Sequence, residues 1–293
     1  MKTKNHQAFS LIEISVVIIV VGILLAGISS GIELYDDYKF KVAQNLTKNS
    51  RVARIKNLEL WFETTLENSF ALGTTSFVDK ITPIELDRIG RWNDANPNIL
   101  PIARNNATQA TLANQPLYYS KAINGLPALK FDGSNDGLFF NGNFLVGADY
   151  TIFVVEKRNS GKSNNCFLSG SSAVNYSRLV LCYRSSTVLT QIHWSSDLDK
   201  SIPAFNAPIN TMHSFVFSKS DGRAIYTNGG TKTVNTSQKL PLIAYENSSI
   251  GAGGSIYYDG YISEIIFYTR ALTDKERQEV ETYLSKKWGI KLG

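Results

Sequence analysis

Cysteine and charged residues are scarce in this chain, and their scarcity excludes several classes of site. The two cysteines, Cys166 and Cys182, form no CxxC pair and no cluster with the three histidines, so a zinc site of the usual spacing is excluded. Charged residues make up 19% of the chain, and the formal net charge of +5 includes Lys2 and Lys4. Because no Arg/Lys cluster is dense enough to line a nucleic-acid groove, we expect no nucleic acid as a partner.

Glycine and aromatic residues are plentiful by contrast. The chain has 21 Gly, 14 Tyr and 15 Phe residues, and this composition is typical of an exported all-β domain rather than a helical cytosolic enzyme. Its 293 residues are enough for one large domain with a sizeable core, or for two smaller domains.

A long apolar run follows eight polar and basic residues. Residues 1–8 read MKTKNHQA, and residues 9–28 form a run of 20 residues, about 30 Å long as a helix, which matches the hydrocarbon core of a bilayer. Lys2 and Lys4 are expected to keep the short leader on the cytoplasmic side. The sequence therefore predicts a leader over 1–8 and a single transmembrane helix over 9–30.

The helix is expected to continue beyond the membrane as a stalk over 31–56. Apolar residues recur there at three- and four-residue steps, at Ile32, Tyr35, Tyr38, Val42 and Leu46. This spacing predicts a face that packs against a globular head, with an end near Thr47–Ser50. The alternative is a polar stalk without a packed face.

Glu13 is unusual inside the apolar run. A carboxylate near the centre of a membrane helix costs roughly 2.5–3.5 kcal/mol, and less near the interface, so it needs a partner. A secretory signal peptide would have its small-residue cleavage site after the apolar run, whereas Ala8 precedes the run. A plain signal anchor accounts for the hydrophobicity but not for Glu13.

The residues around Glu13 resemble the N-terminus of type IV pilins and pseudopilins. The family pattern is a small residue, usually Gly, then the cut and Phe-Thr-Leu-Ile-Glu, and residues 8–13 of this chain read AFSLIE. The resemblance implies cleavage between Ala8 and Phe9 by a prepilin peptidase and N-methylation of Phe9. It also implies that Glu13 faces the new α-amino group of a neighbouring pilin or pseudopilin subunit, where the two charges compensate each other in lipid.

The periodicity changes to that of short strands from about Leu58. Residues 58–63 (LELWFE) are expected to form the first strand, and residues 64–114 mostly loops. Asn228-Gly229 lies between two strand-like runs and is a strong hairpin signal. Further strands are expected over 129–131, 138–140, 150–157, 178–183, 188–194, 214–219, 224–227, 232–234 and 262–268.

A short C-terminal helix is expected to close the chain. Thr273 and Glu276 have the spacing of a capping box, and Gly289 is a natural stop. The apolar stripe of this helix is formed by Val280, Tyr283, Leu284 and Trp288.

The β-rich part resembles the LamG-like branch of the concanavalin A-like lectin/glucanase superfamily. The matching segments are LELWFE (58–63), GRWNDANPN (90–98), NNATQATLANQP (105–116), INGLPALKFDGSNDGL (123–138), YTIFVVEK (150–157) and SEIIFYTRALTDKERQEVETYLSKKWGI (263–290). The resemblance implies a domain over 57–293 built as an all-β antiparallel jelly-roll sandwich. It also implies that loops at one edge bind a glycan or a protein ligand, sometimes with calcium.

Glucanases of this superfamily carry closely spaced acids of the form ExDxE on one strand, so that both carboxylates face the sugar. Glu85-Leu-Asp87 begins such a pattern, but no third acid completes it. Glu156, Glu246 and Glu264 are isolated in the sequence. We therefore predict that the chain is not an enzyme.

Three oxygen-bearing side chains are the candidate ligand or calcium site of the head. Asp132, Asn135 and Asp136 lie in the segment DGSNDG (132–137), whose two glycines permit tight turns. The alternative, which the sequence favours, is a turn whose side chains cap their own backbone. No other cofactor is expected, and the metal is unknown. Trp194, Tyr257 and Tyr258 are candidates for stacking on a sugar, although aromatics of this kind more often pack within a sheet.

Cys166 and Cys182 flank two strand-like runs around a turn over residues 171–177. If the hairpin is centred on Val174, the two cysteines face each other across it, and a periplasmic location would let a disulfide persist. The alternative is a pair of small buried apolar residues without a bond.

The pattern as a whole predicts a minor type IV pilin-like subunit with a lectin-like adhesive head. It would span the bacterial inner membrane once, with its head in the periplasm, and then enter a pilus that extends from the cell. Two alternatives stay open: a pseudopilin of a type II secretion system that contacts cargo, and a membrane-anchored carbohydrate-active enzyme.

Overall fold

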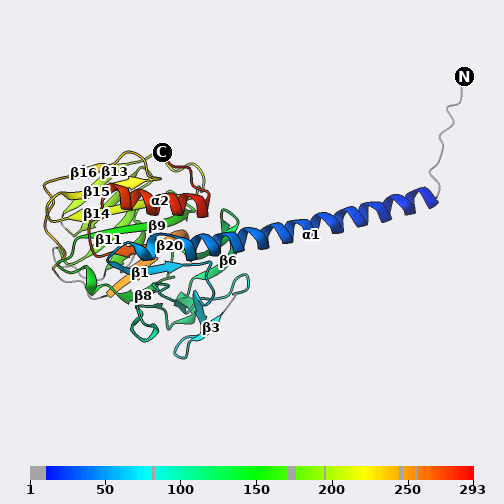
Figure 1. The fold of residues 1–293 in the computed structure, drawn as a ribbon, viewed down its shortest axis with the longest axis horizontal. Helices are drawn as coiled ribbons and strands as arrows, with labels where there is room; N and C mark the ends of the chain where they lie inside the picture. Colours follow the sequence, from blue (N-terminus) through cyan, green and yellow to red (C-terminus); the bar gives the residue numbers. More distant parts are fainter. Residues whose placement is uncertain (1–10, 81–82, 171–175, 195, 244–246, 255) are drawn as a thin grey trace, which may run out of the picture. The chain divides into compact units, whose positions relative to one another are not determined.

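The computed structural model of the chain describes residues 11–80, 83–170, 176–194, 196–243, 247–254 and 256–293 (Figure 1). The chain divides into two compact units, residues 1–42 and 43–293. The cleavage site expected between Ala8 and Phe9 lies outside the described residues, and of Glu13 only the backbone is described.

Helix α1 (Leu11–Asn49) forms the described part of the first unit and continues into the second. It is long and apolar enough to cross a membrane, with a mean hydropathy of 2.5 in its most apolar window. Its large apolar side chains from Ile14 to Ile28 are at least 47% exposed. Such a surface suits lipid or neighbouring apolar helices. The expected long N-terminal apolar helix is therefore confirmed.

The last turns of α1 belong to the second unit and pack within it. Ala43 and Thr47 are both 2% exposed, and the Thr47 Oγ1 atom lies 3.1 Å from the hydroxyl of Tyr283. Leu46, which the spacing placed on the packed face, is only half-buried. Small residues four positions apart allow a helix to approach its neighbour closely. The helix ends at Asn49, within the segment where its end was expected, and the short 3-10 helix η1 (Val52–Arg54) follows.

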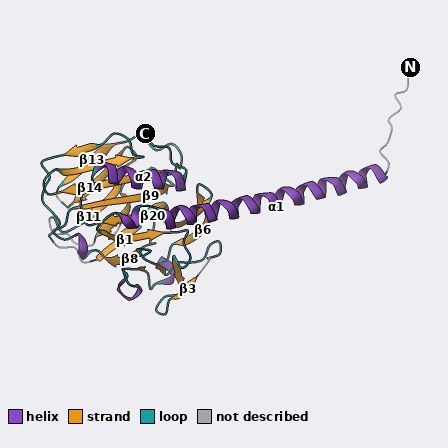
Figure 2. Cartoon of the chain, viewed as in Figure 1, coloured by secondary structure: helices purple, strands orange, loops and turns teal. Residues whose placement is uncertain are grey.

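Two antiparallel sheets make up most of the second unit (Figure 2). In the described residues, the first sheet has eight strands, in the order β16-β15-β14-β9-β20-β7-β6 with β1 also paired to β20. Their bounds are β1 (Leu58–Glu63), β6 (Leu117–Ile123), β7 (Leu126–Asp132), β9 (Tyr150–Arg158), β14 (Thr211–Ser218), β15 (Gly222–Thr227), β16 (Thr233–Asn235) and β20 (Asp259–Tyr268).

The second sheet has ten strands in the described residues, in the order β13-β12-β11-β10-β17-β8-β5-β4-β2-β3. Their bounds are β2 (Phe70–Leu72), β3 (Val78–Lys80), β4 (Arg91–Trp92), β5 (Ala107–Thr108), β8 (Leu138–Asn141), β10 (Asn165–Gly170), β11 (Leu179–Ser185), β12 (Val188–His193), β13 (Asp197–Ser201) and β17 (Asn247–Ile250). A small hairpin pairs β18 (Ala252–Gly253) with β19 (Ile256–Tyr257), and the remaining 3-10 turns are η2 (Pro101–Ala103), η3 (Leu112–Asn114) and η4 (Asn143–Leu145).

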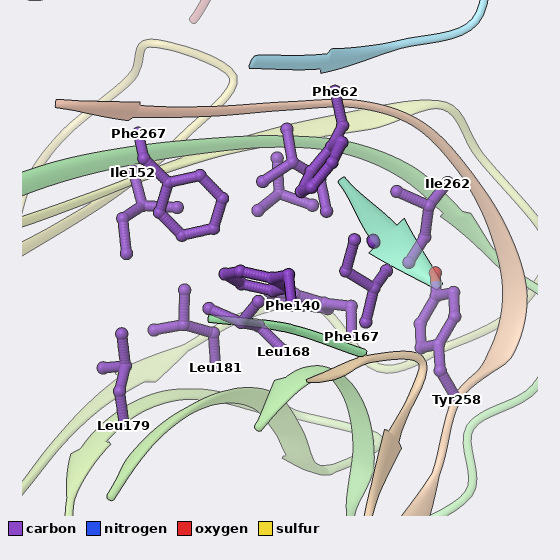
Figure 3. Packing of buried hydrophobic residues seen from close by; sticks show 14 of the residues in the cluster. Phe62, Phe140, Ile152, Phe167, Leu168, Leu179, Leu181, Tyr258, Ile262 and Phe267 are labelled. Carbon is purple, nitrogen blue, oxygen red and sulfur yellow. The ribbon is translucent and has the colours of Figure 1, made fainter. Parts of the chain in front are cut away.

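The core lies between the two sheets. Figure 3 shows Phe62, Ile152 and Phe267 of the first sheet pointing toward Phe140 and Leu181 of the second. Side chains alternate between the two faces of a strand, so each sheet contributes every second residue to this shared core. The antiparallel β-rich head is therefore confirmed, whereas the jelly-roll order of its connections stays a prediction.

The strands could be predicted from the sequence where a strand-like run was long or where the residues of a turn were characteristic. The first strand has the expected bounds, Leu58–Glu63. The Asn228-Gly229 hairpin is confirmed because β15 pairs with β16, both turn residues have positive φ, and Gly230 N donates to Thr227 O at 3.0 Å. The strands that were not expected are β2, β3, β4, β5, β6, β13 and β17, together with the small hairpin β18–β19.

Helix α2 (Asp274–Trp288) closes the chain as expected. Thr273 and Glu276 form the capping box, and Gly289 ends the helix with a left-handed φ of 63°. Val280, Leu284 and Trp288 are buried. The helix lies against the first sheet, where Ser214 Oγ of β14 donates to Glu281 Oε1 at 2.7 Å.

Candidate functional site

The outer face of the second sheet carries an exposed aromatic side chain. Leu138 and Phe140 of β8 point into the core, so Phe139 points away from it and is 46% exposed. Phe139 pairs with Thr108 on one side and with Ser249 on the other, and Ser249 pairs with Ser169. A row of small polar residues therefore crosses the sheet beside one phenyl ring.

A cavity of about 190 Å³ lies over this row, and we call it the outer-face groove. It is lined by Gln109, Asn114, Asn135, Phe139, Gly170, Ser249, Ala252, Gly253, Gly254 and Tyr257. The lining combines three side-chain amides, two aromatic rings and the hydroxyls of Ser249 and Tyr257. Among the residues that the structure describes, it contains no carboxylate, ammonium or guanidinium group.

The β18–β19 hairpin forms one wall of the outer-face groove. Its position depends on Gly251, which has φ 78° and whose N–H donates to Phe167 O at 3.1 Å. A Cβ on this glycine would overlap the ring of Phe131, so only glycine fits there. The turn at Gly251 directs the chain over β10 and brings Tyr257 to the groove.

The three groove amides differ in how far the protein satisfies them. In the described part of the chain, the side chains of Asn114 and Asn135 make no hydrogen bond to the protein. Gln109, in contrast, is engaged, because its Nε2 donates to Gly137 O at 2.9 Å and its Oε1 accepts from Thr111 N at 3.0 Å. An unpartnered amide offers both a donor and an acceptor to a ligand hydroxyl.

The loop over Asp132–Asp136 is a self-capped turn. Asp132 Oδ1 accepts from the backbone N–H groups of Ser134, Asn135 and Asp136 at 2.8, 3.0 and 3.3 Å. Asp136 Oδ2 accepts from Asp132 N at 3.0 Å. This geometry supports the alternative in which the side chains cap their own backbone.

The electrostatics of the turn follow from this arrangement. Burial alone would raise the pKa of Asp132, but the backbone N–H donors hold it below its usual value. Burial and then the charge of Asp132 raise the pKa of Asp136 to about 7. No group of three or more His, Cys, Asp or Glu side chains that could hold a metal occurs in the described residues, and calcium binding stays a prediction. Of the three candidates, only Asn135 lines the groove.

Cys166 and Cys182 are cross-strand partners in β10 and β11, as the expected hairpin required. Both are buried, at 0% and 2% exposure, and pack with Val180. The two thiols are unbonded in the structure, and the disulfide stays a prediction. Burial raises the pKa of the Cys166 thiol well above its usual value.

The three aromatic candidates have different surroundings. Tyr257 lines the groove. Trp194 is partly exposed, and the guanidinium carbon of Arg178 lies 4.8 Å from the centre of the Trp194 ring. Tyr258 is fully buried, and its hydroxyl donates to Glu156 Oε2. Tyr258 is therefore a wrong candidate, because the alternation after the β18–β19 hairpin turns it into the core.

Glu156 and Glu264, isolated in the sequence, each lie in a buried network. Glu156 Oε1 accepts from the Tyr183 hydroxyl at 2.6 Å and lies 3.3 Å from His213 Nε2. Glu264 is the register partner of Glu63 across β1 and β20. Tertiary pairing of distant strands brings these groups together.

We call Glu63, Glu264 and Lys287 the buried acid cluster. Lys287 Nζ donates to Glu63 Oε2 at 2.6 Å and to Glu264 Oε2 at 3.0 Å. Burial would raise the pKa of Glu63, but Lys287 holds it below its usual value. Burial raises the pKa of Glu264, which Lys287 offsets only in part. At most 1% of either glutamate is exposed, so neither carboxylate can reach a sugar at the surface.

The N-terminal segment matches a known motif. Residues 3–29 match the family model described as the prokaryotic N-terminal methylation motif. This match supports processing by a prepilin peptidase and assembly with other pilins, and together with the apolar helix α1 it supports a membrane-anchored pilin. None of the curated proteins compared matches the chain.

Solved structures similar to the chain carry a related fold at low identity. Domain 4 of AbnA, a GH43 extracellular arabinanase from Geobacillus stearothermophilus solved in complex with arabinotriose, is 16% identical with a TM-score of 0.50, over 68% of this chain and 99% of that one. An arabinofuranosidase complexed with arabinofuranosyl-alpha-1,2-xylobiose is 14% identical with a TM-score of 0.55, over 80% and 63% of the two chains.

A Trypanosoma rangeli sialidase in complex with the inhibitor DANA is 12% identical with a TM-score of 0.52, over 86% of this chain and 38% of that one. This chain therefore spans less than two thirds of the sialidase and of the arabinofuranosidase. These likenesses show the fold of the head alone, and the LamG-like assignment stays a prediction.

Proposed function

We propose that this chain is a minor type IV pilin-like subunit whose head binds an uncharged oligosaccharide in the outer-face groove. The single observation that carries the binding role is the composition of that groove, whose described residues supply amides and aromatic rings but no charged group. In this proposal the head lies in the periplasm until the subunit enters a pilus, where it serves adhesion.

The anchoring half of the proposal rests on the N-terminal motif. Prepilin peptidase would cut between Ala8 and Phe9 and leave N-methyl-Phe9 as the first residue. Glu13 would then compensate the new α-amino group of a neighbouring subunit, since each charge alone is costly in lipid.

The binding half rests on the chemistry of sugars. A sugar ring has hydroxyls that exchange hydrogen bonds with amides and a C–H face that packs on aromatic rings. Asn114 and Asn135 would supply the amides, and Phe139 and Tyr257 the rings. Two of the structurally similar proteins were solved with arabinose-containing oligosaccharides bound, so arabinotriose is a reasonable first probe.

A binding role fits the head better than catalysis. Glycosidases place two carboxylates on either side of the scissile bond. The described residues of the groove lining include no carboxylate, and Glu63, Glu156 and Glu264 are buried. The proposal is therefore a binding head without hydrolytic activity.

The test is a glycan array followed by calorimetric titration of arabinotriose into the full chain in detergent micelles. Phe139→Ala should weaken binding of the recognised glycan at least about tenfold, or about 1.4 kcal/mol. Phe77→Ala, a partly buried aromatic outside the groove, is the matched control and should leave binding unchanged. Equal affinity of Phe139→Ala and the unaltered protein, or no glycan bound on the array, would overturn the binding role.

A pseudopilin of a type II secretion system is the second candidate, because it would share the same N-terminal motif. The neighbouring genes separate the two. A retraction motor supports the pilus, whereas a secretin together with a secreted cargo enzyme supports the pseudopilus.

A further inference from the structure

A second cavity, of about 300 Å³, lies beneath the loop that joins β13 to β14, and we call it the loop pocket. Its walls are Arg158, Tyr183, Ile202, Pro203, Ala204, Phe205, Asn206, Ala207, Ile209, Thr211, His213, Thr227 and Asn228. None of these residues lines the outer-face groove. The volume is within the range of pockets that take small molecules.

The loop pocket is held open by backbone hydrogen bonds. Ile202 N donates to Thr187 O at 2.9 Å, and Phe205 N donates to Ser186 O at 3.2 Å. These bonds attach the start of the covering loop to the turn between β11 and β12. The cavity is therefore formed before any ligand arrives, which lowers the entropic cost of binding.

Arg158 is the main polar feature of the pocket wall. It is 8% exposed, and its guanidinium lies between two aromatic rings, 4.0 Å from the centre of Tyr183 and 5.0 Å from that of Phe205. Its hydrogen bonds within the described residues are two long ones, from Nη1 and Nη2 to Ser186 O at 3.4 Å. In the same part of the chain it makes no ion pair.

Glu156, the nearest acidic residue on the same strand, does not form an ion pair with Arg158 in the described residues. Glu156 accepts hydrogen bonds at both oxygens, from Tyr183 on one and from Tyr258 on the other. The guanidinium therefore keeps donors for another group. A buried cation without a close counter-charge is costly, and a ligand carboxylate removes that cost while matching the guanidinium in shape.

We propose that the loop pocket binds a small carboxylate attached to an apolar group. Arg158 would pair with the carboxylate, and Ile202, Phe205 and Ile209 would contact the apolar group. A phosphate or sulfate would be a poorer fit, because a more highly charged anion needs several cations. Arg158 is the one Lys or Arg residue among the described residues that line the pocket.

Two sources could supply this chemistry, a free aromatic acid or the C-terminal carboxylate of a peptide. The test titrates the full chain in detergent micelles with benzoate and with N-acetyl-phenylalanine, and each probe is compared with its neutral amide. We expect one of the acids to bind at least about tenfold more tightly than its amide. Binding of benzoate alone would identify a free aromatic acid as the ligand. Binding of N-acetyl-phenylalanine alone would identify the C-terminal carboxylate of a peptide.

Three variants test whether the acid binds in the loop pocket. Arg158→Gln should abolish the preference for acid over amide, whereas Arg184→Gln, an arginine on β11 that pairs with Asp197 and Asp199, should keep it. Ala207→Trp alters an exposed loop residue that lines the cavity. The larger side chain is expected to fill the cavity and block binding even if Arg158→Gln fails to fold. Acid and amide bound equally, no binding of either acid, or binding unaffected by Ala207→Trp would each overturn the proposal.

Discussion

The buried acid cluster and the outer-face groove use polar side chains in opposite ways. In the cluster, Lys287 donates to both Glu63 and Glu264, and none of the three is more than 2% exposed. In the groove, Asn114 and Asn135 lie at the surface without a protein partner in the described part of the chain. The polar groups of the cluster hold two strands and a helix together, whereas we propose that the polar groups of the groove bind a ligand.

The difference gives each region its own expected response to mutation. Removing a partner from a closed network leaves a buried charge without compensation, which is costly. Removing a side chain from an open groove lets water enter, and the water forms hydrogen bonds with the polar groups that remain. Changes in the cluster should therefore affect stability, and changes in the groove should affect binding.

Lys287→Met should have the largest effect on stability. It keeps the apolar part of the side chain but leaves Glu63 and Glu264 facing each other without a cation. We expect the free energy of unfolding to fall by about 3–5 kcal/mol, measured by urea denaturation of the full chain in detergent. Lys286→Met, an exposed neighbour on α2, is the control and should change it by less than about 0.5 kcal/mol. A small effect at position 287 would remove the contrast between the two regions.

Gly251→Ala should come next, because this glycine positions the wall of the groove. A left-handed φ costs a non-glycine residue about 1–2 kcal/mol, and overlap with the Phe131 ring adds about 1–3 kcal/mol. Gly254→Ala separates the two contributions, since Gly254 also has a positive φ but nothing within 4 Å of an added Cβ. Thermal unfolding should therefore show a clearly larger loss at 251, and equal losses would refute the steric argument.

Asp136, the neighbour of Asn135 in the groove wall, should make the free energy of unfolding depend on pH. Its pKa is raised to about 7 in the folded chain, so its folded form holds a proton that the unfolded chain releases near pH 4. The stabilising contribution is complete below about pH 4 and is lost as the pH rises toward 7. Asp136→Asn should reduce this loss when denaturation midpoints at pH 5 and pH 8 are compared. Asp199→Asn, on the exposed edge strand β13, should behave like the unaltered protein.

Asn135→Ala should have the smallest effect on stability and still weaken glycan binding. Its side chain is exposed, so the free energy of unfolding should change by no more than about 0.5 kcal/mol. Loss of its amide should weaken binding of the recognised glycan several-fold in the same titration used for Phe139. Binding that survives together with a large loss of stability would place Asn135 with the structural residues instead.

The sequence was sufficient for features that depend on near neighbours. Leu58–Glu63 has the expected bounds, and Asn228-Gly229 forms the expected hairpin, because strand alternation and turn chemistry act over a few residues. Short strands such as β4 and β5 were missed because two residues carry no readable period.

The candidate site was only partly predictable. Asn135 and Tyr257 were among the candidates and both line the groove, but Phe139, Gln109 and Asn114 were not foreseen. These residues come together because β8 pairs with β5 and β17, and these strands are far apart along the chain.

The sequence alone determined the methylation motif at residues 3–29, the long apolar helix and the capping box of α2. Each is a local pattern whose chemistry is complete within one segment. Only the tertiary structure decided that Glu264 meets Glu63 and Lys287 and that Tyr258 is buried. The physical reason is strand register, since a shift of one residue would exchange the faces on which all these side chains lie.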